Sequence, residues 1–486
     1  MVRLASILNV LGKIIAIFAV TMLFPLAISF LVDDGAASAY DEAILATAAC
    51  GGLLWLSTRH SAGRELKSRD GFLLVTLVWA TLPIFAMLPL MFFLPELSVT
   101  DAYFEAMSGL TASGATVLTN LDLLPHSLNL WRGLIVWIGG MGVIVLAVAI
   151  LPMLGVGGAQ LFKAETPGPL KDSKLTPRIT ETAKWLWMIY FGLSAACFAC
   201  LRLAGLGWFD AAMHTFTTMG LGGFSSRDAS IGHFDSILVE SVIVLFMLVA
   251  VINFAMHFRV LRERSLLPYF RDPETRACLG VLAGSCVLVA VHLFLSGTYE
   301  DLGTAFRYAT FNVVSVATTT GFATTDYSLW PVFAPIWMLF LCTFVSSSGS
   351  TGGGLKMIRA LALWQQTFRE LRRLVHPRAV LHVKIGRQVI ENNVIFAVLA
   401  FAMLFGSTIV AATLLLAISG ADVVTAFSAA VACVTNMGPG LGAVGPASTY
   451  AVLTDFQTWV CTFAMLLGRL ELFTMFVVLT PSFWRQ

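Results

Sequence analysis

Residues Asp101–Gly114 read DAYFEAMSGLTASG, an apolar segment too short to cross a membrane, followed by a turn of small residues. A spanning helix needs about 20 apolar residues, so apolar segments of roughly 10–14 residues predict buried or re-entrant half-helices. Three later segments share this design: Phe209–Gly223 (FDAAMHTFTTMGLGG), Ala305–Gly321 (AFRYATFNVVSVATTTG) and Ala421–Gly440 (ADVVTAFSAAVACVTNMGPG).

The four turns form an internal repeat. Aligned on Gly114, Gly223, Gly321 and Gly440, they are 109, 98 and 119 residues apart. Each unit reads as helix, half-helix, turn and helix, and such a period is the signature of a repeat architecture. We predict an all-α integral membrane protein with four pseudo-symmetric repeats around one channel-like pore, preceded by two extra transmembrane helices. The expected divisions are 1–69 for the two N-terminal helices, 70–162, 163–275, 276–375 with a broken second helix, and 376–486.

Four glycine turns around one axis suit the passage of a monovalent cation. Irregular backbone at membrane depth is tolerated only where it is buried in protein or lines a watery cavity. Glycine permits backbone conformations that other residues avoid, and a ring of carbonyl oxygens replaces the water shell of a cation. The C-terminal, negative ends of the half-helices add to this attraction. No ring of acids lines the turns, which argues against divalent cations.

The composition excludes several classes of protein. The chain has 486 residues, of which 58% are hydrophobic and 12% charged, and its mean hydropathy is +0.84. A soluble fold carries about 25% charged residues, so soluble enzymes and disordered chains are excluded. The net charge of +2 gives no reason to expect a nucleic acid partner. The eight cysteines lie mostly inside apolar runs and read as small buried side chains.

Ten apolar runs predict membrane spans with both termini on one side. Ala43–Leu56 is short, Pro335–Leu363 is interrupted, and the first run extends too far for a cleavable signal peptide. Most of the 30 lysines and arginines fall in alternate loops, while acids dominate the others. By the positive-inside rule the basic side, with both termini, is cytoplasmic. The other eight runs are Ile7–Leu31, Gly71–Leu94, Trp131–Leu154, Trp185–Leu206, Ile237–Phe258, Ala277–Leu295, Asn393–Ile418 and Leu453–Thr480.

A glycine-rich loop interrupts Pro335–Leu363. Its residues Ser346–Gly354 read SSSGSTGGG, and glycine costs about 1 kcal/mol per residue in a helix relative to alanine. A flexible polar loop at this depth is expected to lie below the four glycine turns, which would act as the ion filter, and to face a cavity. A nucleotide-phosphate loop would need lysine directly after the last glycine, followed by serine or threonine. Leu355 and Lys356 follow instead.

Arg469 lies near the middle of Leu453–Thr480. A mid-membrane arginine costs about 2.5–3.5 kcal/mol on insertion scales, so it faces a cavity or a partner. Glu471 is two residues away and points to a different helix face. Two interpretations follow: a structural salt bridge within the bundle, or a fixed positive charge below the filter that acts on passing cations.

Nine motifs give the chain a specific resemblance to the Trk/Ktr/HKT superfamily of potassium transporters, closest to its bacterial TrkH branch. The resemblance covers essentially the whole chain. The motifs are EAMSGLTASGATVLTNLD from Glu105, WIGGMGVIVLAVAILPMLGVGG from Trp137, FKAETPGP from Phe162, GLGGFSSRDAS from Gly220, TTTGFATTDY from Thr318, GSTGGGLKMIR from Gly349, HPRAV from His376, NMGPGLG from Asn436 and GRLELFTMFVVLTPSFWR from Gly468.

The resemblance implies potassium uptake across the bacterial inner membrane through a fourfold pseudo-symmetric pore, with K⁺ as the transported ion and no organic cofactor. It also implies a homodimer and a cytoplasmic nucleotide-binding ring protein of the TrkA type that gates the pore. Arg469 and the glycine-rich loop are expected to form a constriction, the loop residues being Gly349, Ser350, Thr351, Gly352, Gly353 and Gly354. The expected filter consists of Thr111, Ala112, Ser113, Gly114, Gly220, Leu221, Gly222, Gly223, Thr319, Thr320, Gly321, Met437, Gly438, Pro439 and Gly440. Three glycines in the second turn leave its register open by one residue.

Two other functions are weighed against this hypothesis. A proton-coupled symporter for potassium or another monovalent cation usually has an acidic relay in mid-membrane, which is poorly represented here. An intramembrane enzyme needs polar residues at catalytic spacing, and the spans hold few ionisable candidates. We therefore expect a transporter rather than an enzyme.

Overall fold

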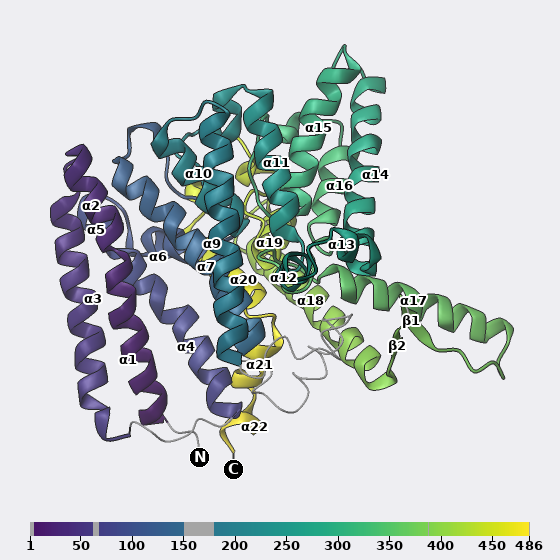
Figure 1. Ribbon diagram of the computed structural model, residues 1–486, viewed down its shortest axis with the longest axis horizontal. Coiled ribbons are helices and arrows are strands. Elements are labelled where there is room, and N and C mark those ends of the chain that lie inside the picture. The colour runs from purple at the N-terminus through teal and green to yellow at the C-terminus, as the bar shows by residue number, and fades with distance from the viewer. Residues whose placement is uncertain (1–3, 62–67, 150–178, 387, 486) are drawn as a thin grey trace.

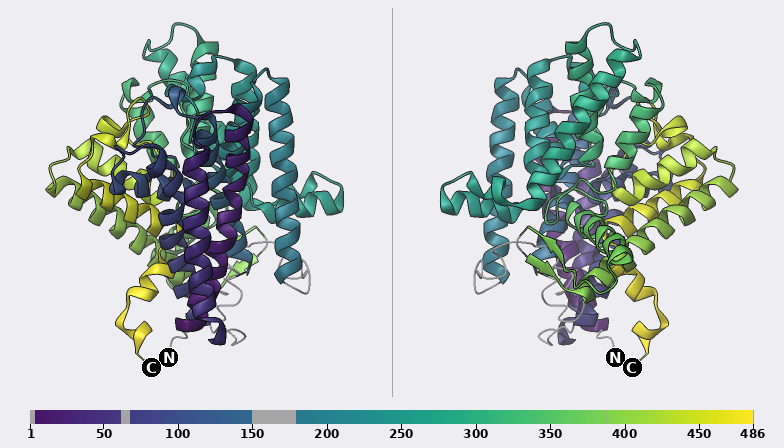
Figure 2. Two further views of the ribbon diagram at one scale, coloured as in Figure 1. Left: turned by 90° about the vertical axis from the view of Figure 1, so that its left-hand side faces the viewer. Right: turned by 90° about the vertical axis from the view of Figure 1, so that its right-hand side faces the viewer.

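The computed structural model describes residues 4–61, 68–149, 179–386 and 388–485. Helices run mostly along one direction, and both termini lie at the same end of the molecule (Figures 1 and 2). The long and connecting helices are α1 (Leu4–Thr21), α2 (Leu23–Val32), α3 (Ala37–Ser57), α4 (Ser68–Ala86), α5 (Leu88–Phe93), α7 (His126–Ala149), α9 (Ile179–Leu203), α11 (Ile237–Val251), α12 (Phe254–Glu263), α13 (Leu267–Arg271), α14 (Pro273–Leu295), α16 (Phe333–Leu341), α17 (Met357–Val375), α18 (Asn392–Ile418), α20 (Asp455–Arg469), α21 (Phe473–Leu479) and α22 (Pro481–Trp484).

Four short helices correspond to the predicted half-helices: α6 (Val99–Leu110), α10 (Trp208–Gly220), α15 (Leu302–Ala317) and α19 (Val423–Thr435). Side chains cap three of their N-termini, because Ser98, Asp301 and Asp422 accept hydrogen bonds from backbone amides of the first turn. The all-α membrane fold with four half-helices is thereby confirmed.

Five described helical segments are long and apolar enough to span a membrane, or up to seven if each of two bent pairs counts as one span. The five are Leu4–Val32, Arg69–Phe93, Ala183–Leu203, Pro273–Leu295 and Asn392–Ile418. Only about a third of each is buried, with side chains such as Ile17, Phe396 and Leu414 largely exposed. Such apolar surfaces face lipid in a membrane protein. Two further helices have sufficient length: α3 with 21 residues, longer than predicted, and α7 with 24.

Two runs predicted as continuous spans are bent in the structure. The run Ile237–Phe258 divides into α11 and α12, whose axes differ by 94°, and Leu453–Thr480 divides into α20 and α21, at 112°. At the second bend Glu471 and Leu472 both have positive φ angles, near 50°. Neither residue is a glycine or proline, so the sequence held no signal of the break.

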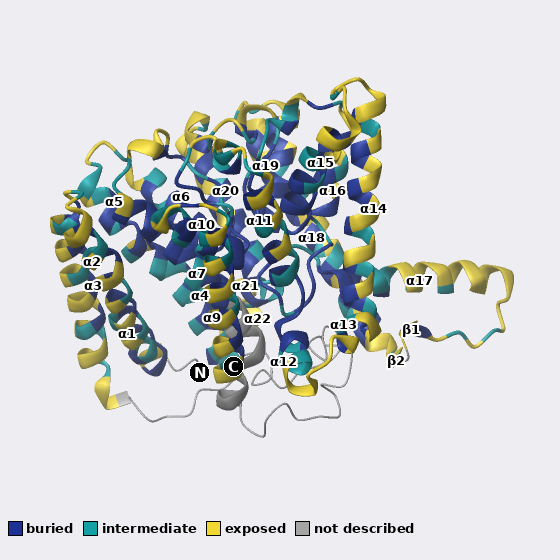
Figure 3. Ribbon diagram, turned by 45° about the horizontal axis from the view of Figure 1, so that its top comes forward, coloured by how far each residue is buried: buried dark blue, intermediate teal, exposed yellow. Residues whose placement is uncertain are grey.

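The predicted interruption of Pro335–Leu363 is confirmed, since α16 ends at Leu341 and α17 begins at Met357. Helix α17 then runs outward from the bundle, ahead of a small antiparallel hairpin of β1 (Val383–Ile385) and β2 (Gln388–Ile390) (Figure 1). The turns after the half-helices and the loop 342–356 lie in the buried centre, whereas most of α17 is exposed (Figure 3).

Candidate functional site

All four half-helices end in the same backbone conformation. A residue with a positive φ angle follows the last helical turn, and the second residue after it is a glycine that also has positive φ. The residue between them donates its N–H to the carbonyl five residues earlier, at 2.8–3.0 Å in all four turns. The first left-handed residues are Ala112, Leu221, Thr319 and Asn436, with φ of 51°, 53°, 59° and 55°, and the glycines are Gly114, Gly223, Gly321 and Gly438, with φ of 84°, 45°, 89° and 100°.

This geometry settles the register of the second turn and corrects that of the fourth. In the second turn, Gly223 takes the glycine position and Gly220 is the last residue of α10. In the fourth turn the equivalent glycine is Gly438, so the alignment on Gly440 was wrong by two residues. The N–H of Gly440 instead donates to the carbonyl of Val444 at 2.8 Å, beyond the turn.

The four turns close into a ring. Each glycine packs against a neighbouring turn, at the residue just before that turn's own glycine. A methyl group added to the α-carbon of the first glycine would collide with the carbonyl group of that residue. A side chain at these positions would therefore force the ring to shift, and the positive φ angles disfavour one independently. The contacts run once around the ring: Gly114 against Gly222, Gly223 against Thr320, Gly321 against Met437, and Gly438 against Ser113.

A cavity of about 280 Å³ opens on one side of this ring. All four turns contribute to its lining, through Gly114, Gly223, Gly321 and Pro439. We call this cavity the vestibule; all four turns face it.

Each half-helix holds the chain beyond its turn through one buried polar side chain. Glu105 on α6 accepts hydrogen bonds from Thr116 Oγ1 and Val117 N, each at 3.0 Å. The same role falls to a different residue type in each repeat, so the turns are braced alike without sequence identity. The other three contacts join His214 Nε2 to Ser225 Oγ at 2.9 Å, Asn312 Nδ2 to Thr324 Oγ1 at 2.8 Å, and Leu441 N to Ser428 Oγ at 2.8 Å.

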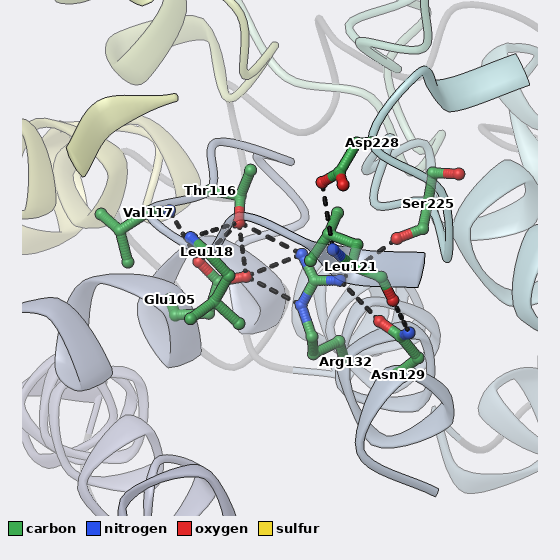
Figure 4. A network of polar contacts seen from close by, with 9 residues as sticks. All are labelled: Glu105, Thr116, Val117, Leu118, Leu121, Asn129, Arg132, Ser225 and Asp228. Atoms are coloured by element: carbon green, nitrogen blue, oxygen red, sulfur yellow. Dashed lines mark hydrogen bonds and ion pairs between the residues drawn. The ribbon is translucent and has the colours of Figure 1, made fainter. Parts of the chain in front are cut away.

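A buried ion pair joins the first two turns (Figure 4). Arg132 on α7 approaches Glu105 at 2.8 Å, and both side chains are fully buried. The Arg132 guanidinium also donates to the carbonyl of Ser225 at 3.1 Å and lies 4.4 Å from the ring centroid of Phe224. Because Ser225 and Phe224 directly follow the second turn, Arg132 fixes the distance between two neighbouring quarters of the ring.

One carboxylate, that of Asp228, lines the vestibule, and two more bind Arg227, which also lines it. Arg227 donates to Asp122 at 3.1 Å and to Asp210 at 2.9 Å, while Asp228 accepts the N–H of Leu121 at 3.1 Å. Partial burial raises the pKa of Asp122, but the hydrogen bonds from Arg227 and from the N–H of Asp228, together with the positive charge of Arg227, outweigh this and leave that pKa below its usual value. The ionised form of Asp122 is therefore favoured.

The glycine-rich loop lies against the ring on the side of the half-helices. The N–H of Gly353 donates to Thr319 Oγ1 at 2.9 Å, and Thr351 Oγ1 donates to the carbonyl of Met219 at 3.1 Å. A methyl group at Gly353 would collide with the carbonyl of Thr435. The loop thus contacts three of the four repeats.

The loop is hydrogen-bonded at several points along its length. Ser350 Oγ donates to the carbonyl of Ser347 at 2.6 Å, and the carbonyl of Gly349 accepts the N–H of Phe254 at 3.1 Å. Gly352 accepts a hydrogen bond from the Lys356 ammonium, and Gly354 has a φ of 82°.

Arg469 binds this loop directly. Its Nη1 donates to the carbonyl of Thr351 at 2.9 Å and its Nη2 to the carbonyl of Gly139 at 3.0 Å. The residue is 4% exposed and ends α20, so its predicted place in the middle of a continuous span was wrong. Among the described residues no carboxylate pairs with Arg469, which disfavours the structural salt bridge.

Two further basic residues are buried. Lys356 is 4% exposed and Arg359 is 1% exposed. Arg359 Nη2 donates to Glu471 at 2.8 Å, which joins the start of α17 to the bend between α20 and α21.

Three ring residues escaped the sequence analysis: Thr318, Thr435 and Asn436. Thr318 and Thr435 occupy the position of Thr111, three residues before the glycine. The spacing Thr-x-x-Gly in three of the four turns was the signal that would have identified them. Asn436 donates to Ser113 Oγ at 2.8 Å and so links the fourth turn to the first.

Comparisons with known proteins agree with this geometry. The TrkH family, described as "Cation transport protein", matches residues 37–485. The chain is 47% identical to the Trk system potassium uptake protein TrkH of Halomonas elongata, over 99% of this chain and 100% of that protein. It is 44% identical to the protein of the same name from Escherichia coli K12, over 99% of each chain. The crystal structure of the potassium transporter TrkH from Vibrio parahaemolyticus superimposes with a TM-score of 0.91 at 42% identity, covering 99% of this chain and 100% of that one. The chain therefore belongs to the TrkH family of cation transport proteins.

Proposed function

We propose that this protein takes up potassium ions through a selective, gated pore whose filter is the ring of four glycine turns. The closed ring, open to a vestibule lined by all four turns, is the observation that carries the proposal. The relatives named as potassium uptake proteins support the choice of ion.

The ring would select by its backbone. In an extended strand, successive carbonyl groups point to opposite sides. The residues with positive φ at alternate positions of each turn interrupt this alternation, so that neighbouring carbonyl groups can all face the axis. Carbonyl oxygens replace the hydration shell of K⁺, and their number and field decide between K⁺ and Na⁺. The half-helices direct their C-terminal ends toward the same centre and stabilise a cation there.

The corrected register gives a sharp test with a matched control. Gly438→Ser places a side chain against the carbonyl of Ser113, whereas Gly420→Ser, at a glycine with a similar φ of 98° outside the ring, meets no neighbouring atom. We expect the first variant to admit more Na⁺ relative to K⁺ and the second to keep the wild-type ratio. Rb⁺ and Na⁺ influx into proteoliposomes measures both. Equal ratios in Gly438→Ser and wild type, with uptake preserved, would remove the filter assignment.

Arg469 and the loop Gly349–Gly354 form the gate in this proposal. The guanidinium lies against the loop that covers the inner side of the ring. The two terminal nitrogens of Arg469 donate hydrogen bonds to backbone carbonyl groups, which carry no net charge, so the positive charge of the guanidinium is not neutralised. A passing cation therefore meets both a steric and an electrostatic barrier at this level.

A cytoplasmic nucleotide-binding ring protein of the TrkA type would operate this gate. The loop continues directly into α17, whose arginines Arg372 and Arg373 are exposed and offer a contact for a partner. Nucleotide sensitivity of ion flux should then require the partner, and nucleotide binding by the isolated membrane chain at comparable affinity would contradict this assignment.

We place the protein in the bacterial inner membrane, with both termini cytoplasmic, as a homodimer. One face of α17 carries exposed apolar side chains at helical spacing, namely Trp364, Phe368, Leu371 and Val375. A second copy covering this face would remove it from water or lipid headgroups. The mass of the detergent-solubilised protein, measured by light scattering, tests the dimer.

A further inference from the structure

A second cavity lies to the side of the pore, between α1, α4 and α7. Its volume is about 200 Å³, and its walls are apolar side chains that include Ile14, Val75, Leu82 and Ile138. Gly142 and Trp79 form its inner end, with the last residue of α6, Leu110.

The cavity lies at the depth of the hydrocarbon core. Ile14 falls in the middle part of the span Leu4–Val32, and the α4 residues 74–82 fall in the middle part of Arg69–Phe93. Neighbouring side chains on the same two spans are apolar and exposed, at 67% for Ile17 and 43% for Ile84. The cavity therefore lies on two spans whose other side chains present an apolar surface to lipid.

We propose that one acyl chain of a membrane phospholipid occupies this cavity. A water molecule needs two to four polar partners, and the apolar lining provides none of that kind. An empty space leaves the lining without dispersion contacts. The volume exceeds that of an apolar cavity of about 150 Å³ that binds benzene, so it holds a stretch of several methylene groups. Phospholipid chains are the hydrocarbon that a bilayer supplies at this depth.

The bound chain would support the pore region from behind. Trp79 is 8% exposed, and its ring centroid lies 5.8 Å from the Arg469 guanidinium carbon. Gly139, another cavity residue, provides the carbonyl that accepts the hydrogen bond of Arg469. An acyl chain in the cavity thus packs on Trp79 and Gly139, the two residues that contact Arg469 from the lipid side. This packing does not depend on which ion the filter selects.

Fluorescence quenching by lipids with bromine at mid-chain tests the proposal, because bromine quenches tryptophan on contact. The protein has 12 tryptophans. The fluorescence intensity that comes from Trp79 is therefore obtained as the difference between the wild-type protein and the Trp79→Phe variant. We expect most of this intensity to be lost in brominated phospholipid bilayers. Gly142→Leu, which fills the cavity, should restore it.

Two controls keep the test decisive. Gly142→Ala should behave as wild type, since its methyl group would lie 3.4 Å from the Trp79 ring, an ordinary contact. If Gly142→Leu does not fold, Val75→Phe fills the cavity from the opposite wall. Equal Trp79 intensity in brominated and unbrominated bilayers would overturn the proposal. Quenching by a brominated detergent in lipid-free micelles, without quenching by phospholipid, would overturn the choice of phospholipid.

Discussion

The Glu105 carboxylate and the Arg132 guanidinium are fully buried and satisfy each other. Breaking such a pair by removing one partner costs about 3–5 kcal/mol, because the remaining charge is left buried. We expect Glu105→Gln to lower the thermal unfolding midpoint strongly. The double variant with Arg132→Gln should lose less than the sum of the two single variants.

The exposed pair Arg259–Glu263 on α12 offers a matched control. Its side chains are 32% and 45% exposed, so Arg259→Gln should change stability by less than about 1 kcal/mol. An unchanged unfolding midpoint in Glu105→Gln would show that the buried pair does not brace the ring.

At the scale of the element, the loop between α16 and α17 acts together with the end of α20. Removing the Arg469 charge lowers the barrier to a cation by about 2 kcal/mol, for charges about 8 Å apart at an effective dielectric near 20. We therefore expect Arg469→Ala to raise basal Rb⁺ influx roughly tenfold or more, measured in proteoliposomes without a partner protein. Arg469→Lys keeps the charge and most of the barrier.

The ratio of K⁺ to Na⁺ should stay constant in both Arg469 variants, because the filter lies on the other side of the loop. Lower influx in Arg469→Ala than in wild type would show that the residue supports conduction or folding instead.

The elements also show how far the sequence could lead. Hydropathy and the glycine spacing predicted the half-helices and their turns, since both follow from local composition. The bend at Glu471 and Leu472 could not be predicted, because tertiary contacts such as that of Glu471 with Arg359 hold these residues in a conformation their types do not favour. The partner of Arg132 was equally hidden, since Glu105 is 27 residues away and read as part of a half-helix. The divisions of the chain at 69, 162, 275 and 375 stay a prediction, and the expected span Trp131–Leu154 ends outside the described residues.

At the scale of the whole molecule, we propose passive conduction rather than proton coupling. Three acids in the described membrane region already have partners: the buried Glu105 with Arg132, the partly exposed Glu471 with Arg359, and the buried Glu274 with the N–H of Ser348 at 2.7 Å. We expect the reversal potential of reconstituted protein to follow the K⁺ gradient, by about 59 mV per tenfold change for a monovalent ion. A pH gradient at fixed K⁺ should leave it unchanged, and a shift with pH would favour the symporter.

The closed ring of four unlike turns has a consequence for inheritance. A channel assembled from four identical chains shows every mutation in all quarters at once, so small changes are multiplied. Here one codon alters a single quarter, and the quarters already differ, reading TASG, GLGG, TTTG and TNMG. Ion preference in this lineage can therefore drift in small, separate steps, with three unaltered quarters keeping the pore open while the fourth varies.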